Sequence, residues 1–410
     1  MLTRRDAIAL AALALLTIGV IMVNSAGMRI VPVDAALNSA AEPAVTVSSI
    51  LLSRTAMYAV AAVAAMFVVS RFSPRWLDRA ARLPGAVPLV LFALSVLFML
   101  VLLSAVYWPG IGKEVNGANR WVRVPVIQQF QPSEVVKWLV LPALAVAAVA
   151  TGPRIRNTLT GAMPLLLAVA AIAGAIVLED LGTAVLVAGV GVMLVLAAGM
   201  RFWSIALLGP VAGAGFGLAV LSSPYRVDRV VSFIDPFRDA SGDGYHMIQS
   251  MATIAGGGPF GRGLGHGLQK FGYLPEDTTD FVFAVICEEL GLTGALMVLA
   301  IYAALFVALA AVARAAQSPT HRLVVLGVLL TLVGQTVINL FVVTGLGPTK
   351  GIALPLLSAG GTGWILIGAV LGMVISIDRA GTEQARPETT SDADRADHQA
   401  ETPNDELAPA

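Results

Sequence analysis

Residues 161–200, GAMPLLLAVAAIAGAIVLEDLGTAVLVAGVGVMLVLAAGM, decide the fold class. Two apolar runs, 161–178 and 181–200, are separated only by the acidic pair Glu179-Asp180. A helix that crosses a bilayer needs about 20 mostly apolar residues. We therefore predict two membrane-spanning helices that meet at a tight break, with almost no loop between them.

Similar apolar runs recur along the rest of the chain, so that ten spans are predicted in all. The other eight are 6–23, 51–70, 84–107, 132–150, 203–221, 281–313, 323–343 and 355–377. The run 281–313 is too long for one straight span, and part of it is expected to lie outside the membrane. The pattern predicts an all-α polytopic membrane protein with about ten transmembrane helices and one large extracytoplasmic segment, 222–280.

The composition supports this fold class. Of the 410 residues, 57% are hydrophobic and 13% are charged, whereas charged residues make up about 25% of a typical soluble domain. A soluble fold of this size cannot bury so much apolar surface, so the excess must face lipid. A cytosolic enzyme, a nucleic-acid-binding module and a disordered scaffold are therefore excluded. The single cysteine, Cys287, excludes an internal disulfide and a cysteine-based metal cluster.

The arginines of the short loops predict the orientation of the helices. Loops 71–83 and 151–157 together hold six arginines, whereas the opposite loop 24–50 holds only Arg29. With ten spans, both termini are expected in the cytoplasm. The apolar run after Arg4-Arg5 could also be a signal peptide, but the many runs that follow favour a first span.

Two segments depart from the membrane pattern. Residues 378–410 hold nine acidic residues and three arginines, a net charge of −6, with no apolar periodicity. They are predicted to form a disordered acidic cytoplasmic tail beyond a membrane domain of residues 1–377. The external segment 222–280 is long for a structureless loop, which suggests a function.

Ionisable residues at membrane depth are costly and are functional candidates. Glu134 and Lys137 are three residues apart on a helix and can pair, either as a helix cap or as a charged wall of a cavity. Asp180 is either a surface capping residue or a helix cap that faces a polar cavity. Lys350, in the turn 345–351, could bind phosphate or anchor the turn at the interface.

The external segment holds several basic residues, including Arg226, Arg229 and Arg262, and a glycine-rich run over 256–267. Such glycines let the backbone approach a ligand and aim N–H groups at an anion. Outside the cell, a diphosphate on a lipid carrier is a more plausible anion than a nucleotide. The alternative is a flexible loop.

Three carboxylates, Glu276, Asp277 and Asp280, stand before an apolar run. Asp280 directly precedes this run, where partial desolvation would raise its pKa and make it a better base. The alternative is a helix cap with solvated neighbours. Glu288 and Glu289 lie inside the run and also need partners.

These stretches resemble the SEDS family of peptidoglycan glycan-chain polymerases, which includes division-type (FtsW) and elongation-type (RodA) members. The resemblance runs from Asn116 to Ile377 through NGANRW with QPSEVVK, then DLGTA, then the highly specific segment 222–294, and finally GLGPTKGIALPLLSAGG. The PTKG form resembles the division type.

The sequence also departs from the family pattern. Leu178-Glu179 stand where the family usually has Gln-Pro, which adds a negative charge beside Asp180. Ala359 replaces the usual tyrosine, and Thr362-Gly363 replace a serine pair.

The resemblance implies that the substrate is lipid II, a disaccharide-pentapeptide on undecaprenyl diphosphate, polymerised with inversion at the outer face of the bacterial cytoplasmic (inner) membrane. A sugar hydroxyl needs a general base, for which Asp280 is the candidate. The leaving diphosphate needs cations or N–H groups. The predicted substrate-binding residues are Lys350, Arg226, Arg229, Arg262, Lys270, Glu276, Glu134, Lys137 and Asp180.

The resemblance also implies partners: a class B penicillin-binding protein, which is a transpeptidase, and other membrane proteins of the division machinery. No nucleic acid is expected. No cofactor is assigned. A divalent cation (Mg²⁺ or Mn²⁺) at the diphosphate is an alternative, but no cluster in the sequence has the spacing of a dedicated metal site. The competing functions are a lipid-linked precursor flippase or transporter and a non-catalytic division scaffold.

Overall fold

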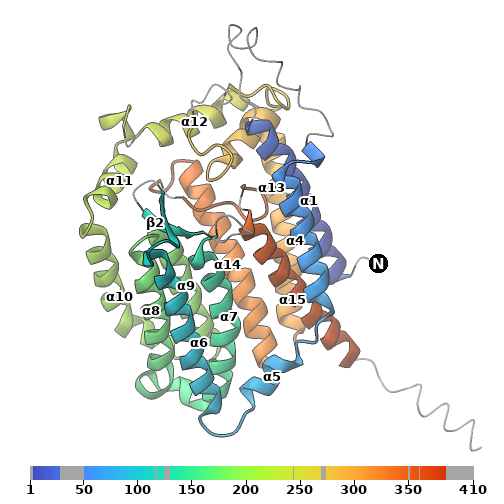
Figure 1. Ribbon diagram of the computed structural model, residues 1–410, viewed down its shortest axis with the longest axis vertical. Helices are drawn as coiled ribbons and strands as arrows, with labels where there is room; N and C mark the ends of the chain where they lie inside the picture. Colours follow the sequence, from blue (N-terminus) through green and yellow to red (C-terminus); the bar gives the residue numbers. More distant parts are fainter. Residues whose placement is uncertain are drawn as a thin grey trace, which may run out of the picture.

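The computed structural model describes residues 3–27, 50–115, 118–123, 130–242, 244–268, 274–349, 351–359 and 361–384. Within these ranges, ten apolar helices form one bundle (Figure 1). They are α1 (Arg4–Ala26), α4 (Arg54–Arg71), α6 (Val87–Ser104), α7 (Pro132–Thr151), α8 (Met163–Val177), α9 (Leu181–Ala197), α10 (Trp203–Leu221), α13 (Val282–Ala315), α14 (Pro319–Val343) and α15 (Thr362–Gln384). Nine of the ten form spans long enough to cross a membrane, with α8 counted together with the turn before it as Thr158–Val177, whereas α9 is shorter, with 17 residues. The predicted polytopic helical fold is confirmed.

The tight break between two spans is also confirmed. Helix α8 ends at Val177 and α9 begins at Leu181. Asp180 caps α9, because its Oδ1 accepts a hydrogen bond from the Thr183 amide at 3.1 Å and its Oδ2 accepts one from Thr183 Oγ1 at 2.7 Å. Asp180 is buried, so it is a cap within the protein and not on its surface.

Helix α13 is long because it is two helical segments joined at Gly291. This residue has φ 70° and ψ −166°, a conformation open to glycine and strained for other residues. A Cβ atom on Gly291 would also lie 2.3 Å from the amide nitrogen of Gly261. The long apolar run therefore contains a break that its hydropathy alone does not reveal.

The segment 222–280 is largely folded. It contains α11 (Pro224–Ile234), a 3₁₀ turn η4 (Pro236–Asp239) and α12 (Tyr245–Gly257), and α12 packs on α13. These helices cover one end of the bundle, which we call the α12 end (Figure 1). The opposite end carries the short helix α5 (Arg75–Ala81).

A β-hairpin, which the sequence analysis did not predict, lies at the α12 end (Figure 1). Its strands, β1 (Gly112–Val115) and β2 (Ala118–Val122), are antiparallel, with Lys113 opposite Trp121. It follows the 3₁₀ turn η1 (Ala105–Tyr107) at the end of α6. Two further short turns, η2 (Gly152–Arg156) and η3 (Thr158–Ala162), join α7 to α8.

The predicted boundary of the acidic tail at 377 is wrong. Helix α15 continues to Gln384, and Asp378 is buried near its end. The Asp378 carboxylate lies 3.2 Å from Arg4 Nε and 3.5 Å from Arg5 Nε of α1. These ion pairs hold the helix end in the bundle. The predicted disorder concerns residues 385–410, which lie outside the described residues.

Candidate active site

Asp280 lies in the loop that leads into α13 and is half-buried. The amide nitrogen of Asn339, on α14, donates to the Asp280 carbonyl at 2.7 Å and to the Ile352 carbonyl at 2.7 Å. One buried side chain thus ties the Asp280 loop to the turn after α14. This bridge fixes the backbone on both sides of the candidate base.

The surroundings of Asp280 favour its neutral form. Burial, followed by the negative charges of Glu276 and Asp180, raises the pKa of Asp280 from 3.8 to about 7. The positive charges of Arg120 and Arg229 act in the opposite direction and lower this pKa. A carboxylate that titrates near neutral pH is well suited to accept a proton from a hydroxyl group.

Arg229, one of the predicted substrate-binding residues, contacts the turn after α14 and acts on Asp280 through its charge. It extends from α11 and donates to the Thr349 carbonyl at 2.6 Å. Its guanidinium lies over the Tyr225 ring, 4.6 Å from the ring centroid, and it also donates to the Tyr225 hydroxyl. Arg229 therefore fixes the turn that approaches Asp280 while keeping its charge at the site.

Arg226, a predicted anion contact, donates to three backbone carbonyls. Its guanidinium donates to the Ala219 carbonyl at 2.6 Å, to the Val177 carbonyl at 2.6 Å and to the Leu178 carbonyl at 3.1 Å. These carbonyls lie at the C-terminal ends of α10 and α8, which lack partners within their own helices. These bonds join α11 to the C-terminal ends of α8 and α10 and use both terminal nitrogens of the guanidinium.

The glycine-rich run is packed against α13, contrary to the prediction that its amides face an anion. The Arg262 amide donates to the Glu288 carbonyl and the Gly263 amide to the Glu289 carbonyl, both at 2.9 Å. A Cβ atom on Gly257 would lie 1.8 Å from the Cys287 carbonyl oxygen. Glycine is thus required here for contact between two backbones.

The buried carboxylates of α13 hold this glycine-rich loop and α1 together. Glu288 Oε1 accepts from the Leu268 amide at 2.9 Å and lies 3.7 Å from Arg262 Nε. Glu289 Oε2 accepts from Ser25 Oγ of α1 at 2.7 Å. Arg262 is therefore an ion-pair partner of α13, which accounts for it without a substrate.

Glu134 and Lys137 form the predicted pair, and the pair is internal. Lys137 Nζ lies 2.7 Å from Glu134 Oε1 and donates to Gln335 Oε1 of α14 at 3.0 Å. Gln335 in turn donates to the Ala353 carbonyl at 2.7 Å. Lys137 is 2% exposed, which excludes a solvated helix cap. The network joins α7, α14 and the turn that follows α14.

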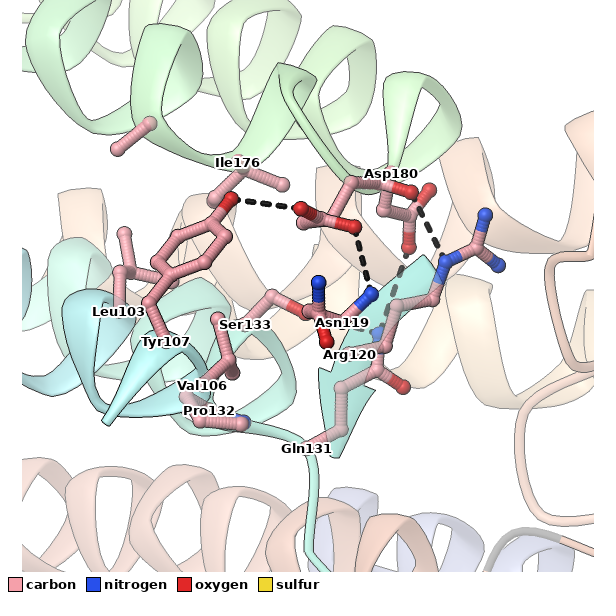
Figure 2. Close-up of a pocket in the computed structure, with 12 residues that line it drawn as sticks. Leu103, Val106, Tyr107, Asn119, Arg120, Gln131, Pro132, Ser133, Ile176 and Asp180 are labelled. Carbon is pink, nitrogen blue, oxygen red and sulfur yellow. Dashed lines mark hydrogen bonds between the residues drawn. The ribbon is translucent and has the colours of Figure 1, made fainter. Parts of the chain in front are cut away.

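A small pocket lies beside Asp180 and is lined in part by strand β2 of the hairpin (Figure 2). Its walls are apolar at one end and polar at the other. The apolar residues are Leu103, Val106, Tyr107, Pro132, Ala175 and Ile176, and the polar ones are Asn119, Arg120, Gln131, Ser133, Glu179 and Asp180. In Figure 2 the Arg120 guanidinium points away from the apolar end.

Two of the predicted contacts, Lys270 and Lys350, lie outside the described residues. Glu276 is exposed, has φ 56° and accepts a hydrogen bond from Thr279 Oγ1 at 2.8 Å. Within the described part of the chain, no group of three or more His, Cys, Asp or Glu side chains could hold a metal ion.

Two site residues were missing from the predicted set. Arg120 lies in the NGANRW stretch before α7 and is absent from the predicted substrate-binding residues, yet its charge acts on Asp280. Asn339 is one of two side-chain amides, with Gln335, in the apolar run 323–343, and a buried amide needs hydrogen-bond partners. An amide in an apolar run was the signal that could have identified it.

The chain matches known proteins over nearly its whole length. The family model FTSW_RODA_SPOVE, described as "Cell cycle protein", matches residues 6–383. A protein of Trichlorobacter lovleyi named "Probable peptidoglycan glycosyltransferase FtsW" is 38% identical over 304 residues, which cover 74% of this chain and 79% of that protein. A protein of the same name from Alkalilimnicola ehrlichii is 34% identical over 388 residues, covering 93% and 91%.

Solved structures also resemble this fold. A chain from a structure described as "Structural coordination of polymerization and crosslinking by a peptidoglycan synthase complex" has a TM-score of 0.67 and 29% identity, and the match covers 91% of this chain and 97% of that chain. The rod shape determining protein RodA of Thermus thermophilus has a TM-score of 0.59 and 26% identity, with coverage of 91% and 95%.

Proposed function

Since this chain belongs to the FtsW/RodA/SpoVE family of cell cycle proteins, we infer that its site polymerises peptidoglycan glycan chains. It is a membrane-embedded peptidoglycan glycosyltransferase, and the names of its relatives indicate the division type. We propose that the substrate is lipid II. The observation that carries this proposal is Asp280, a half-buried carboxylate with a pKa of about 7 and two arginines whose charges act on it.

The proposed reaction is a single displacement. A sugar hydroxyl of one lipid II attacks the anomeric carbon of a lipid-linked glycan, and Asp280 takes the hydroxyl proton as the new C–O bond forms. The bond from the anomeric carbon to the diphosphate breaks, and the diphosphate leaves with the bonding electron pair. An α-linked donor then gives a β-linked product, which requires one base and no covalent intermediate.

Positive charge at the site would stabilise the departing diphosphate. Arg229 and Arg120 are the described cations that act on Asp280. Lys350 and Lys270 remain candidates from the sequence. Arg226 and Arg262 are weaker candidates. Arg226 donates to backbone carbonyls, and Arg262 forms an ion pair with Glu288.

A divalent cation, if required, would be held chiefly by the diphosphate itself. Mg²⁺ is commonly bound by substrate phosphates together with one or two carboxylates, and in the described part of the chain no group of three or more His, Cys, Asp or Glu side chains could hold it without the substrate. We propose that EDTA lowers the polymerisation rate and that Mg²⁺ or Mn²⁺ restores it. A rate unchanged by EDTA would mean that the arginines and lysines suffice.

The chain is an integral membrane protein, and we propose that it lies in the bacterial cytoplasmic membrane with both termini in the cytoplasm. The α12 end, with Asp280, would then face outward, where lipid II is polymerised. A topology reporter fused after Gln384 should be active only in the cytoplasm. Reporter activity only outside the cell would reverse the orientation.

We propose a class B penicillin-binding protein as the partner, together with other membrane proteins of the division machinery. The resemblance to a chain of a peptidoglycan synthase complex supports a transpeptidase partner. The test is polymerisation of lipid II by the purified protein, with and without that transpeptidase, and with Asp280→Asn as the inactive control. Transfer of lipid II across vesicles without polymer formation would favour a flippase, and neither activity would favour a scaffold.

A further inference from the structure

Glu179 uses both its side chain and its backbone to hold the β-hairpin. Its Oε1 accepts from the Tyr107 hydroxyl at 2.6 Å, and its Oε2 accepts from the Asn119 amide at 2.8 Å. Its carbonyl accepts from Arg120 Nε at 2.9 Å. These bonds are among the dashed lines of Figure 2, in which the donors Tyr107, Asn119 and Arg120 are labelled. Two of the three donors belong to strand β2.

We propose that Glu179 is a positioning residue for the proposed polymerisation: it fastens the hairpin to the α8–α9 break and so holds the Arg120 guanidinium on the Asp280 side of the pocket. A carboxylate with two donors at 2.6 and 2.8 Å forms charge-assisted bonds, which are the stronger kind. The Arg120 Nε bond to the Glu179 carbonyl directs the rest of the guanidinium away from the apolar end of the pocket.

The same break also holds α11, the helix that carries the second arginine of the site, Arg229. The Val177 and Leu178 carbonyls accept from Arg226 of α11. Three consecutive residues, 177–179, thus contact the two elements, α11 and the hairpin, that bring positive charge to Asp280. Glu179 is the residue of this break whose side chain bonds Tyr107 and strand β2 but not α11. Its removal should loosen strand β2 and so shift Arg120, even though the backbone carbonyl remains, and it should leave Arg229 in place.

The expected consequence is a change in the pH dependence of the reaction. The charged groups that act on Asp280 are Glu276 of its own loop, Asp180 at the start of α9, Arg120 of β2 and Arg229 of α11. If Arg120 moves away, one of the two favourable charges is lost and the pKa of Asp280 rises. The acidic limb of the rate profile then moves to higher pH.

The first measurement is the rate of lipid II polymerisation from pH 5.5 to 8.5 for the wild type and Glu179→Ala. The ratio of the rate at pH 6 to that at pH 8 should fall about threefold in the variant. This fall corresponds to a shift of the acidic limb by about half a pH unit. Arg120→Met should lower the ratio in the same direction, and the double variant should add little further change. Glu114→Ala, an exposed carboxylate on β1, should match the wild type.

The second measurement is hydrogen–deuterium exchange, which needs no activity. Glu179→Ala should increase exchange in residues 118–122, and Tyr107→Phe, which removes one bond, should give a smaller increase. An equal loss of rate at every pH, or unchanged exchange in the hairpin, would overturn the proposal. If the wild type polymerises nothing but Glu179→Ala releases the hairpin, the fastening role stands and the proposed function fails.

Discussion

The Asp280 carboxylate packs directly against the backbone of Gly351. A Cβ atom placed on Gly351 would lie 2.7 Å from Asp280 Oδ2, closer than such atoms come in proteins. The candidate base is therefore positioned by the absence of a side chain on the turn after α14. Asn339 bonds the backbone on both sides of this contact, so neither side can yield easily.

Gly351→Ala should displace the Asp280 carboxylate and lower the polymerisation rate by about 10–10²-fold, because small displacements of a reacting group are costly. Gly347→Ala is the matched control in the same turn, since its Cβ would lie 3.4 Å from Phe341 Cβ. The measurement is the lipid II polymerisation rate of the two purified variants. Wild-type activity of Gly351→Ala would show that the exact place of the carboxylate is unimportant.

Asp280→Asn keeps the size of the side chain but cannot accept the proton. Polymerisation should fall by about 10²–10⁴-fold, the usual contribution of a general base, while lipid II binding persists. Asp277 is half-buried and so is a poor control, whereas Asp228 on α11 is exposed, and Asp228→Asn should stay active. If Asp280→Asn polymerises normally, Glu276 and Asp180 are the next candidates for the base.

The pKa of Asp280 also predicts a dependence of stability on pH. Because the folded-state pKa of about 7 exceeds the ordinary value of 3.8, the folded protein binds a proton that the unfolded chain releases. This stabilisation is complete below about pH 4 and is lost as the pH rises through 7. Asp280→Asn should therefore melt about 2–6 °C above the wild type at pH 8. The difference should shrink at pH 4, and a constant difference would contradict the assignment.

Lys350 should act through its charge. A cation near a diphosphate stabilises the leaving group as negative charge develops, so Lys350→Arg should retain more activity than Lys350→Met. The measurement is the polymerisation rate at saturating lipid II. If both variants equal the wild type, the residue has no phosphate role.

Removal of residues 385–410 should leave the polymerisation rate in detergent unchanged, since these residues follow the last helix. Removal of 378–410 should lower the melting temperature by several degrees, because it deletes the Asp378 ion pairs to Arg4 and Arg5. Asp378→Asn in the full chain should reproduce most of that loss. Equal melting temperatures for both truncations would show that the end of α15 contributes no stability.

Much of the fold could be predicted because long apolar runs have few alternatives in a membrane protein. The α8–α9 break was predicted from Glu179-Asp180 between two such runs. Asp280 was a candidate base because it directly precedes a third run. The end of α15 was misjudged because Asp378 is acidic, and only its contact with α1 explains why it is buried.

The features that could not be predicted depend on contacts between segments that are distant in the sequence. The glycines of 256–267 suggest a ligand loop in isolation, but they are needed because that loop lies on the backbone of α13. Arg226 resembles an anion contact until the carbonyls of α8 and α10 are seen beside it. The hairpin has short, polar strands without alternation, so it gave no strand signal.

The break at Gly291 has a mechanical consequence. The segment of α13 before it is joined to α1 through Glu289 and Ser25, and to the glycine-rich loop through Glu288 and Leu268. Below the break the helix runs on toward the α5 end as a separate rod. The two segments need not share one axis, so this 34-residue element does not have to cross the membrane as one straight helix. The upper segment can therefore serve the site that begins at Asp280, while the lower segment serves as the span.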